Sequence, residues 1–369
     1  MSGAAREVRQ LTGLRGLAAL DVMLSHYGLW KIPALQPLVF NNAAVDLFFC
    51  LSSFTLCLVY GAGQTARLDL RGYYAARAGR IYPLYLAATV FTLAIGLIWR
   101  EHAFAGADAV LLARQFAQQA SMLGAWPIPA LSGFWNPPAW SISAEVFCYV
   151  LVFPVLYAAA RRGRTLPPGW LVAGTVLATL ASVAMYLRHY DSTVNGIGFP
   201  PPADAWAYWT ALTRAVTMAV AGWCAYLLWR QNGAVARLAG RFASLIALAF
   251  ALVVALAPFG GWNSQCCVVL APVLILGLMA PGTWVARLLA WRPVHGLGAI
   301  SYAIYLLHWP VRDFARHVLG FAMHDDALRI LVPMILTLLA AYASTRWFEH
   351  PARIAIRRMF GVRQRPAVG

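Results

Sequence analysis

The chain has 369 residues, of which 61% are hydrophobic and only 11% are charged, and its mean hydropathy is +0.64. Soluble domains carry about 25% charged residues, so this composition excludes a soluble globular protein and indicates an integral membrane protein. The formal net charge is +16, but the sequence contains no recognisable motif for binding nucleic-acid bases. We therefore assign it to loops beside the membrane and its anionic lipid and expect no nucleic-acid partner.

Apolar runs long enough to cross a bilayer recur along the whole chain. They cover residues 10–29, 43–60, 81–99, 141–160, 169–187, 206–229, 242–258, 265–281, 297–315 and 328–348. The first run is long, carries charges and lacks a small-x-small cleavage pattern, so we interpret it as a retained span and not as a signal peptide. The pattern predicts an all-α, polytopic membrane bundle of about ten transmembrane helices, formed as a single domain over residues 1–369.

An eleventh apolar segment, at residues 110–126, is short and polar, and the distribution of arginine decides its status. If this segment does not span, 19 Lys and Arg residues lie on the side of both termini and seven lie on the opposite side. The positive-inside rule then predicts cytoplasmic termini, a cytoplasmic tail at about 350–369, and an interfacial or re-entrant helix at 110–126 on the outer side.

The six cysteines fall within or at the edges of apolar runs, and their spacing fits neither a metal site nor a disulfide framework. We expect them to be small core residues, and we expect no bound metal.

The first apolar run holds three ionisable residues, and such groups in a span usually face a bundle interior or a watery cavity. Arg15 and His26 are eleven residues apart, which places them on one helix face about 16 Å apart along the axis. His26 is either a general base or a hydrogen-bonded packing residue, while Asp21 points elsewhere. Asp46, near the outer end of the second run, either orients and stabilises the His26 imidazole or caps its helix.

Arg77 and Arg80 lie one turn apart at the cytoplasmic mouth of the third run, in "RAGRIYPLY". Forked guanidinium donors match phosphate oxygens, so this pair suits a phosphorylated ligand. The alternative is a purely topological or lipid-binding role.

Two further stretches bring polar groups to the bundle. Ser141 and Glu145 share a helix face at i, i+4, and Ser301, Tyr305 and His308 form an i, i+4, i+7 stripe. Such stripes either hold helices together or line a site. Because no serine elbow, metal cluster or Gly-rich phosphate loop is present, a direct transfer with histidine as general base is favoured over a covalent serine enzyme.

Six stretches together resemble the acyltransferase-3 family of integral membrane O-acyltransferases: "LTGLRGLAALDVMLSH", "DLFFCLSSF", "RAGRIYPLY", "WNPPAWSISAE", "SYAIYLLHWPV" and "WFEHPAR". The resemblance implies ten spans with cytoplasmic termini in a bacterial inner membrane. It also implies transfer of an acyl group, often acetyl, from a cytoplasmic acyl-CoA co-substrate to a hydroxyl of a carbohydrate or other acceptor, with no permanently bound cofactor.

The family's residues carry over onto named positions of this sequence. They match the arginine at Arg15, the histidine at His26, the basic pair at Arg77 and Arg80, and the tryptophan-serine-acid motif at Trp140, Ser141 and Glu145. In this interpretation Arg77 and Arg80 hold the phosphates of the donor, Arg15 lies along the path of the acyl arm, and His26 is the base.

The remaining site candidates have less defined roles. Asp46, Glu145 and His308 are further catalytic candidates, and Ser141, Trp140 and Tyr305 contact the acceptor or are structural. Two positions depart from the family: Thr12 stands where aspartate is common, and Ser53 replaces a usual glycine. The chain ends soon after its last span, so the extracytoplasmic hydrolase-like domain of some members is not expected.

Two other classes of function stay open. Polar groups in a helical bundle also mark the pathways of transporters and flippases, although no alternating-access repeat is visible in the sequence. A catalytically silent sensor or scaffold is the third possibility, and the retained His26 and arginine pair argue against it.

Overall fold

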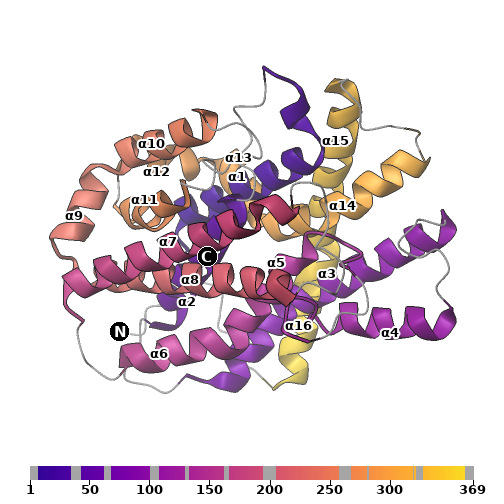
Figure 1. The fold of residues 1–369 in the computed structure, drawn as a ribbon, viewed down its shortest axis with the longest axis horizontal. Coiled ribbons are helices and arrows are strands. Elements are labelled where there is room, and N and C mark those ends of the chain that lie inside the picture. The colour runs from indigo at the N-terminus through magenta and orange to yellow at the C-terminus, as the bar shows by residue number, and fades with distance from the viewer. Residues whose placement is uncertain are drawn as a thin grey trace.

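The structure is a computed structural model that describes residues 7–34, 43–61, 68–99, 108–128, 133–161, 166–193, 205–256, 267–280, 282–318, 320 and 327–361. Over these ranges all regular elements are helical (Figure 1). The helices are α1 (Arg9–His26), η1 (Leu29–Lys31), α2 (Ala43–Gly61), α3 (Leu70–Ile98), α4 (Ala109–Ala120), α5 (Ala139–Phe147), η3 (Cys148–Val152), α6 (Phe153–Arg161), α7 (Pro168–Thr193), α8 (Ala205–Gln231), α9 (Ala234–Arg241), α10 (Ala243–Leu256), α11 (Ala271–Leu278), α12 (Trp284–Leu289), α13 (Arg292–Ala299), α14 (Ser301–Val318), α15 (Ala327–Ser344), η5 (Thr345–Glu349) and α16 (His350–Met359). The predicted all-α fold is confirmed.

Within the described residues, each of the ten apolar runs overlaps a helix or helices joined end to end. In the described part of the chain, six helical segments are long and apolar enough to cross a membrane, and the pair α9 and α10, bent by 67°, would make a seventh. Helices α1 and α14 have 18 residues each but carry charged residues, which lower their apolar character. The total of about ten spans and the orientation of the termini stay predictions.

The segment at 110–126 contains α4, a helix of 12 residues whose first turn is capped by Asp108. At 1.5 Å per residue its length is about 18 Å, too short for a hydrocarbon core of about 30 Å. This length agrees with the prediction that the segment does not span.

The predicted cytoplasmic tail begins as ordered helix. Residues 350–359 form α16, which follows η5 without a break and packs against α3. A Cβ atom on Gly79 would lie 3.5 Å from the Cα of Arg353, an ordinary van der Waals distance, so the two helices are in contact here. The cytoplasmic placement of this tail stays a prediction, and residues 362–369 lie outside the described ranges.

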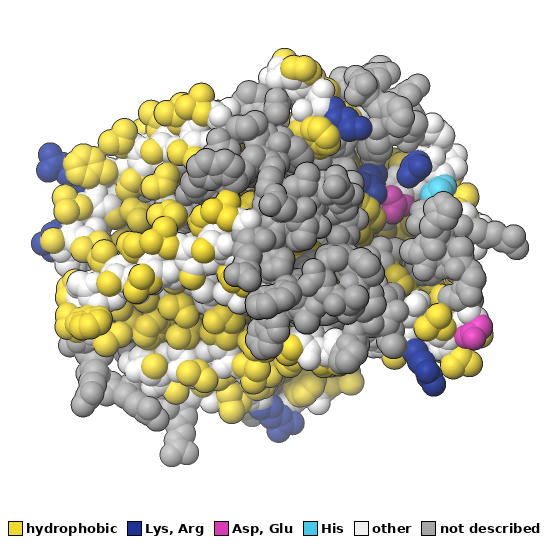
Figure 2. All heavy atoms as spheres, in the orientation of Figure 1, with side chains coloured by type: hydrophobic (Ala, Val, Ile, Leu, Met, Phe, Trp, Pro, Cys, Tyr) yellow, Lys and Arg dark blue, Asp and Glu magenta, His cyan; other side chains and the backbone are white. Residues whose placement is uncertain are grey.

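The surface is apolar over wide areas. Figure 2 shows hydrophobic side chains spread over much of the left part of the visible face. Among the exposed large residues, Trp170 is 73% accessible and Leu177 is 68% accessible. Soluble monomers rarely expose apolar patches beyond a few hundred Å², so lipid is the medium that this surface suits, and the protein is an integral membrane protein.

Glycines bring α1 against α12 and α13. A Cβ atom on Gly16 would lie 2.4 Å from the backbone nitrogen of Gly298, and a Cβ atom on Gly298 would lie 2.0 Å from the carbonyl oxygen of Thr12. Small residues allow such close approach of helix backbones in membranes. This contact fixes the face of α1 that carries the glycines and leaves Arg15, between Gly13 and Gly16, to point away from it.

We expect Gly298→Ala to destabilise the protein by about 2 kcal/mol, because overpacking against a fixed backbone costs about 1–3 kcal/mol. The matched control is Gly296→Ala on the same helix, where an added Cβ meets no atom within 4 Å. Thermal unfolding of the purified protein in detergent measures the difference. Equal melting temperatures for the two variants would show that α1 and α13 do not approach as the structure has them.

Candidate active site

A cavity of about 690 Å³ lies between α1, α2, α3, α5, η3 and α14. Its charged lining residues are Arg15 from α1, Arg77 and Arg80 from α3, and Glu145 from α5. Ser141 and Tyr305, two of the residues singled out in the sequence, also line it. The structure thus brings six of the predicted site residues to one space.

The positive charge of this cavity is the property that decides which ligand it suits. The described lining holds three guanidinium groups and one carboxylate. The Nε atom of Arg77 is buried and has no hydrogen-bond partner, and its guanidinium lies 5.7 Å from the ring centroid of Tyr149. A cavity with surplus donors and surplus positive charge is suited to an anion with several oxygen acceptors.

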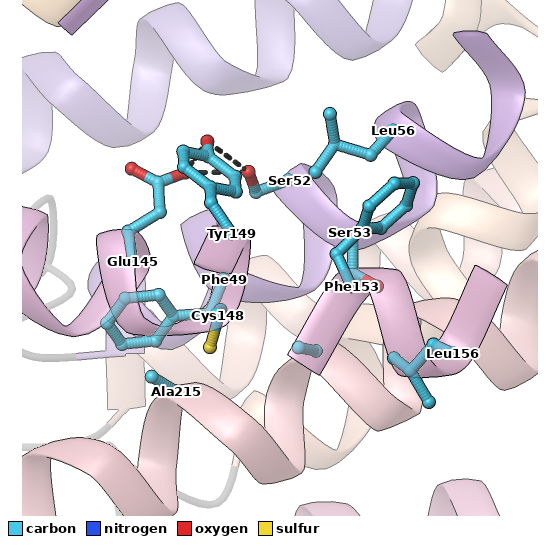
Figure 3. A pocket seen from close by; sticks show the side chains of 11 residues that line it. Phe49, Ser52, Ser53, Leu56, Glu145, Cys148, Tyr149, Phe153, Leu156 and Ala215 are labelled. Atoms are coloured by element: carbon cyan, nitrogen blue, oxygen red, sulfur yellow. Dashed lines mark hydrogen bonds between the residues drawn. The ribbon is translucent and has the colours of Figure 1, made fainter. Parts of the chain in front are cut away.

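Two hydroxyl groups donate hydrogen bonds to Glu145, the one carboxylate of the described lining. Ser52 Oγ donates to Glu145 Oε1 at 2.6 Å and Tyr149 Oη donates to the same oxygen at 2.5 Å. Figure 3 shows Glu145, Tyr149 and Ser52 turned toward one another, joined by dashed lines. Tyr149 belongs to η3, a π-helical stretch that directly follows α5, the helix of Glu145, and π-bulges occur frequently at functional sites.

A smaller pocket of about 300 Å³ adjoins this trio (Figure 3). Apart from Ser52, Ser53, Glu145 and Tyr149, its walls are largely apolar and include Phe49, Leu56, Phe153 and Leu156. Ser53, which departs from the family pattern, lies here with its side chain buried and its Oγ atom without a hydrogen-bond partner.

A line of polar groups runs from the cavity to the predicted base. Ser141 Oγ and Tyr305 Oη are 2.6 Å apart, and the Tyr305 ring lies 6.1 Å from that of His308. His308 Nε2 is 3.0 Å from His26 Nδ1. His26 itself does not line the cavity, so the structure places the two histidines at one end of this line and the arginines at the other.

The partner of His26 is another histidine. The two imidazole rings are nearly parallel, with an interplanar angle of 16° and centroids 5.0 Å apart. The Trp309 ring meets the His26 ring edge-on at 5.4 Å. His308 is fully buried, and Tyr27 Oη donates to its carbonyl oxygen at 2.9 Å. The rings are therefore held from α1 and from α14 together.

Arg312 adds a positive charge beside this pair. Its guanidinium lies 3.5 Å from the ring centroid of Trp309 and pairs with Asp313 at 2.9 Å. It also donates to the carbonyl oxygen of His26 at 3.3 Å. The guanidinium and the Trp309 ring thus fix the end of α1 at which His26 lies.

The structure does not place Asp46 as the orienting acid of His26. Its carboxylate pairs with Arg214 of α8, through Nε at 3.2 Å and Nη2 at 2.8 Å, and accepts a bond from Ser182 of α7. Asp46 is fully buried. The prediction is corrected because a buried guanidinium with a matching fork satisfies this carboxylate better than a neutral imidazole does.

Trp140 packs against the ion pair of Asp46 and Arg214. The Arg214 guanidinium lies 5.3 Å from the Trp140 ring centroid and 5.4 Å from that of Tyr186. Aromatic faces attract a cation through the ring quadrupole. Trp140 therefore covers the pair of Asp46 and Arg214. Of the two roles considered for Trp140, acceptor contact and structure, this contact favours the structural one.

Thr12, the other departure from the family pattern, lies beside an acid after all. Thr12 Oγ1 donates to Glu7 Oε1 at 2.9 Å, and the same carboxylate oxygen is 3.0 Å from Nε2 of His295. Burial raises the pKa of Glu7, but bonds from His295 and Thr12 outweigh it and hold that pKa below its usual value. The N-terminal approach to α1 is in this way tied to α13.

Several residues at the site were missed in the sequence. They are Ser52 and Tyr149 around Glu145, Arg214 and Ser182 around Asp46, and Arg312 beside the histidines. Arg214 had a detectable signal, because an arginine within an apolar run requires a partner and Asp46 is an intramembrane acid that could supply one. Serine and tyrosine are common in membrane spans, so the sequence held no signal for the pairing of Ser52 and Tyr149 with Glu145.

The described residues hold no group of three His, Cys, Asp or Glu side chains that could bind a metal ion. Five of the six cysteines are described and all five are buried, and Cys266 lies outside the described ranges.

Residues 8–346 match the family model described as an acyltransferase domain. Among curated proteins, the chain is 25% identical to Acyltransferase MdmB of Streptomyces mycarofaciens, over 84% of this chain and 80% of that protein. It is 26% identical to the Putative membrane-bound transacylase BcsY of Komagataeibacter xylinus, over 95% of this chain and 86% of that protein.

A third relative is longer than this chain. The Putative peptidoglycan O-acetyltransferase YrhL of Bacillus subtilis (strain 168) is 26% identical over 97% of this chain, but the match spans only 57% of that protein. No solved structure shows a significant match.

Proposed function

The chain belongs to the acyltransferase-3 family, and we propose that this membrane acyltransferase moves a short acyl group, acetyl in the simplest case, from a cytoplasmic acyl-CoA to an acceptor hydroxyl. Arg77 and Arg80 bind phosphates of the donor, Arg15 lies along the path of the acyl arm, and His26 is the general base. Both termini are cytoplasmic in this proposal, and the protein lies in a bacterial inner membrane.

The observation that carries the proposal is the excess of guanidinium groups in the 690 Å³ cavity. Glu145 is the one acid of its described lining, and two hydroxyl groups already hydrogen-bond to it. Three arginines around one carboxylate leave a net positive site, which supports a polyphosphate ligand such as a CoA ester.

The chemistry is a direct transfer. The acceptor oxygen attacks the thioester carbonyl carbon while His26 takes the hydroxyl proton. The C–S bond then breaks, and the CoA sulfur leaves as a thiolate that takes up a proton. A positioned base of this kind contributes about 100-fold to 10,000-fold in rate.

The acceptor is proposed from the relatives. Two proteins that the chain resembles are named Putative peptidoglycan O-acetyltransferase YrhL, from Bacillus subtilis, and Peptidoglycan O-acetyltransferase OatA, from Listeria monocytogenes. A carbohydrate hydroxyl is accordingly the acceptor that we propose for this chain.

We expect Arg77→Ala and Arg80→Ala to raise KM for acetyl-CoA by about tenfold or more and to leave kcat largely intact at saturating donor. A hydrogen bond to a charged group contributes about 1.5–3 kcal/mol, and these side chains bind the donor without contacting the reacting atoms. Initial-rate kinetics over a range of donor concentrations measure the effect.

The matched control is Arg71→Ala on the same helix, at an exposed position outside the cavity. If Arg71→Ala raises KM as much as the cavity variants do, the basic charge of this face acts only through general attraction. Unchanged donor kinetics in the Arg77 and Arg80 double variant would assign the pair to topology alone.

A further inference from the structure

We propose that His308 is a positioning residue that sets the tautomer of His26 and so presents the Nε2 lone pair of His26 as the base. The inference rests on the proposed function, since it concerns how the same base is prepared. The observation that carries it is a chain of two hydrogen bonds whose direction is fixed at one end by a backbone carbonyl.

The fixed end is the carbonyl oxygen of Ile304. His308 Nδ1 lies 3.2 Å from it, and a carbonyl oxygen only accepts hydrogen bonds. Nδ1 of His308 therefore carries the proton. In a neutral imidazole the other ring nitrogen then has a free lone pair, so His308 Nε2 is an acceptor.

The second bond follows from the first. His308 Nε2 lies 3.0 Å from His26 Nδ1, and a contact of that length between two ring nitrogens requires one donor. Because His308 Nε2 accepts, His26 Nδ1 donates. The proton of His26 is then on Nδ1, and its Nε2 atom holds the lone pair that removes a proton from the acceptor hydroxyl.

The surroundings keep His308 neutral, as this assignment requires. The His308 side chain is fully buried, and the neighbouring guanidinium of Arg312 disfavours a second positive charge. The role resembles that of the acid in a serine protease triad, which holds the catalytic histidine in its correct tautomer. Here a neutral imidazole supplies the acceptor, since Asp46 is bound to Arg214.

Two substitutions of similar size separate this role from packing. In His308→Gln the amide oxygen can take the place of Nε2 and accept from His26, but the bond to Ile304 is lost. In His308→Asn the amide nitrogen can take the place of Nδ1 and donate to Ile304, but no acceptor faces His26. We expect His308→Asn to lower kcat by about tenfold or more, as a wrong tautomer does in other enzymes, and His308→Gln to stay within about threefold of the unaltered protein, with KM for acetyl-CoA unchanged in both.

The assay uses the full-length protein in vesicles, with acetyl-CoA and a soluble glycan acceptor, and melting temperatures report folding. If both variants fold and the kcat of His308→Asn equals or exceeds that of His308→Gln, His308 acts through its bond to the carbonyl oxygen of Ile304, and the inference is wrong. If neither variant folds, the same comparison is made by nitrogen NMR of histidine in the unaltered protein, where a proton on Nε2 of His26 contradicts the inference. Absence of transfer by the unaltered protein would instead contradict the proposed function.

Discussion

Replacing His26 with alanine should lower kcat by about 100-fold or more, the usual scale for loss of a positioned base, while the protein folds and enters the membrane normally. His26 hydrogen-bonds to the ring of His308 at 3.0 Å and to the backbone of Val22, and its ring contacts that of Trp309, but the residue is only partly buried. Its removal therefore costs these local ring contacts and leaves the buried core of the bundle in place. Initial rates at saturating donor and acceptor, together with a melting curve, measure both effects.

His317→Ala is the matched control. His317 belongs to the same helix as His308 and stacks on Trp99, away from the line that joins the histidine pair to the cavity. Its loss should leave turnover unchanged. A well-folded His26→Ala protein with near-normal turnover would show that His26 is structural, and the base would then be sought at His308 or Glu145.

The largest expected effect on stability comes from Asp46→Ala. The substitution leaves the buried guanidinium of Arg214 without its carboxylate, and removal of one partner from a buried pair costs about 3–5 kcal/mol. Asp108→Ala is the control, because that acid is exposed and only caps α4, a loss of about 1 kcal/mol. Thermal unfolding in detergent compares the two.

A double variant separates charge from packing. Asp46→Leu combined with Arg214→Met should recover much of the stability lost in Asp46→Ala, because apolar residues of similar size often replace a buried ion pair without cost. If Asp46→Ala is as stable as Asp108→Ala, the ion pair with Arg214 does not form as the structure shows it. If it is stable but inactive, Asp46 has a catalytic role, as the sequence suggested.

Much of the helical fold could be predicted from the sequence, because apolar length alone determines where a chain can cross lipid. In the described part of the chain, the ten runs found in the sequence overlap helices, and the polar segment around Gln118 forms a short helix. The break between α9 and α10 and the docked helix α16 were not predictable in this way. Both depend on contacts with other helices, which hydropathy does not contain.

The cavity was predictable in part. Arg15, Arg77 and Arg80 were linked in the sequence by motif and by depth, and they line one space in the structure. Depth alone misassigned Asp46, since two residues at a similar height in a bundle can lie on different sides of it. The choice between His26 and Arg214 as its partner depends on helix packing, including the contact of Gly222 with the backbone of Cys50 that brings α8 against α2.

Transfer of radiolabelled acetyl from acetyl-CoA tests the account most directly. Purified protein in sealed vesicles is supplied with labelled donor on the side of the termini and with a glycan acceptor on the other side. The account predicts a covalently acetylated glycan from the unaltered protein and almost none from His26→Ala. Label or glycan that crosses the membrane unmodified, with no acetylated product, would contradict acyl transfer and identify a transporter.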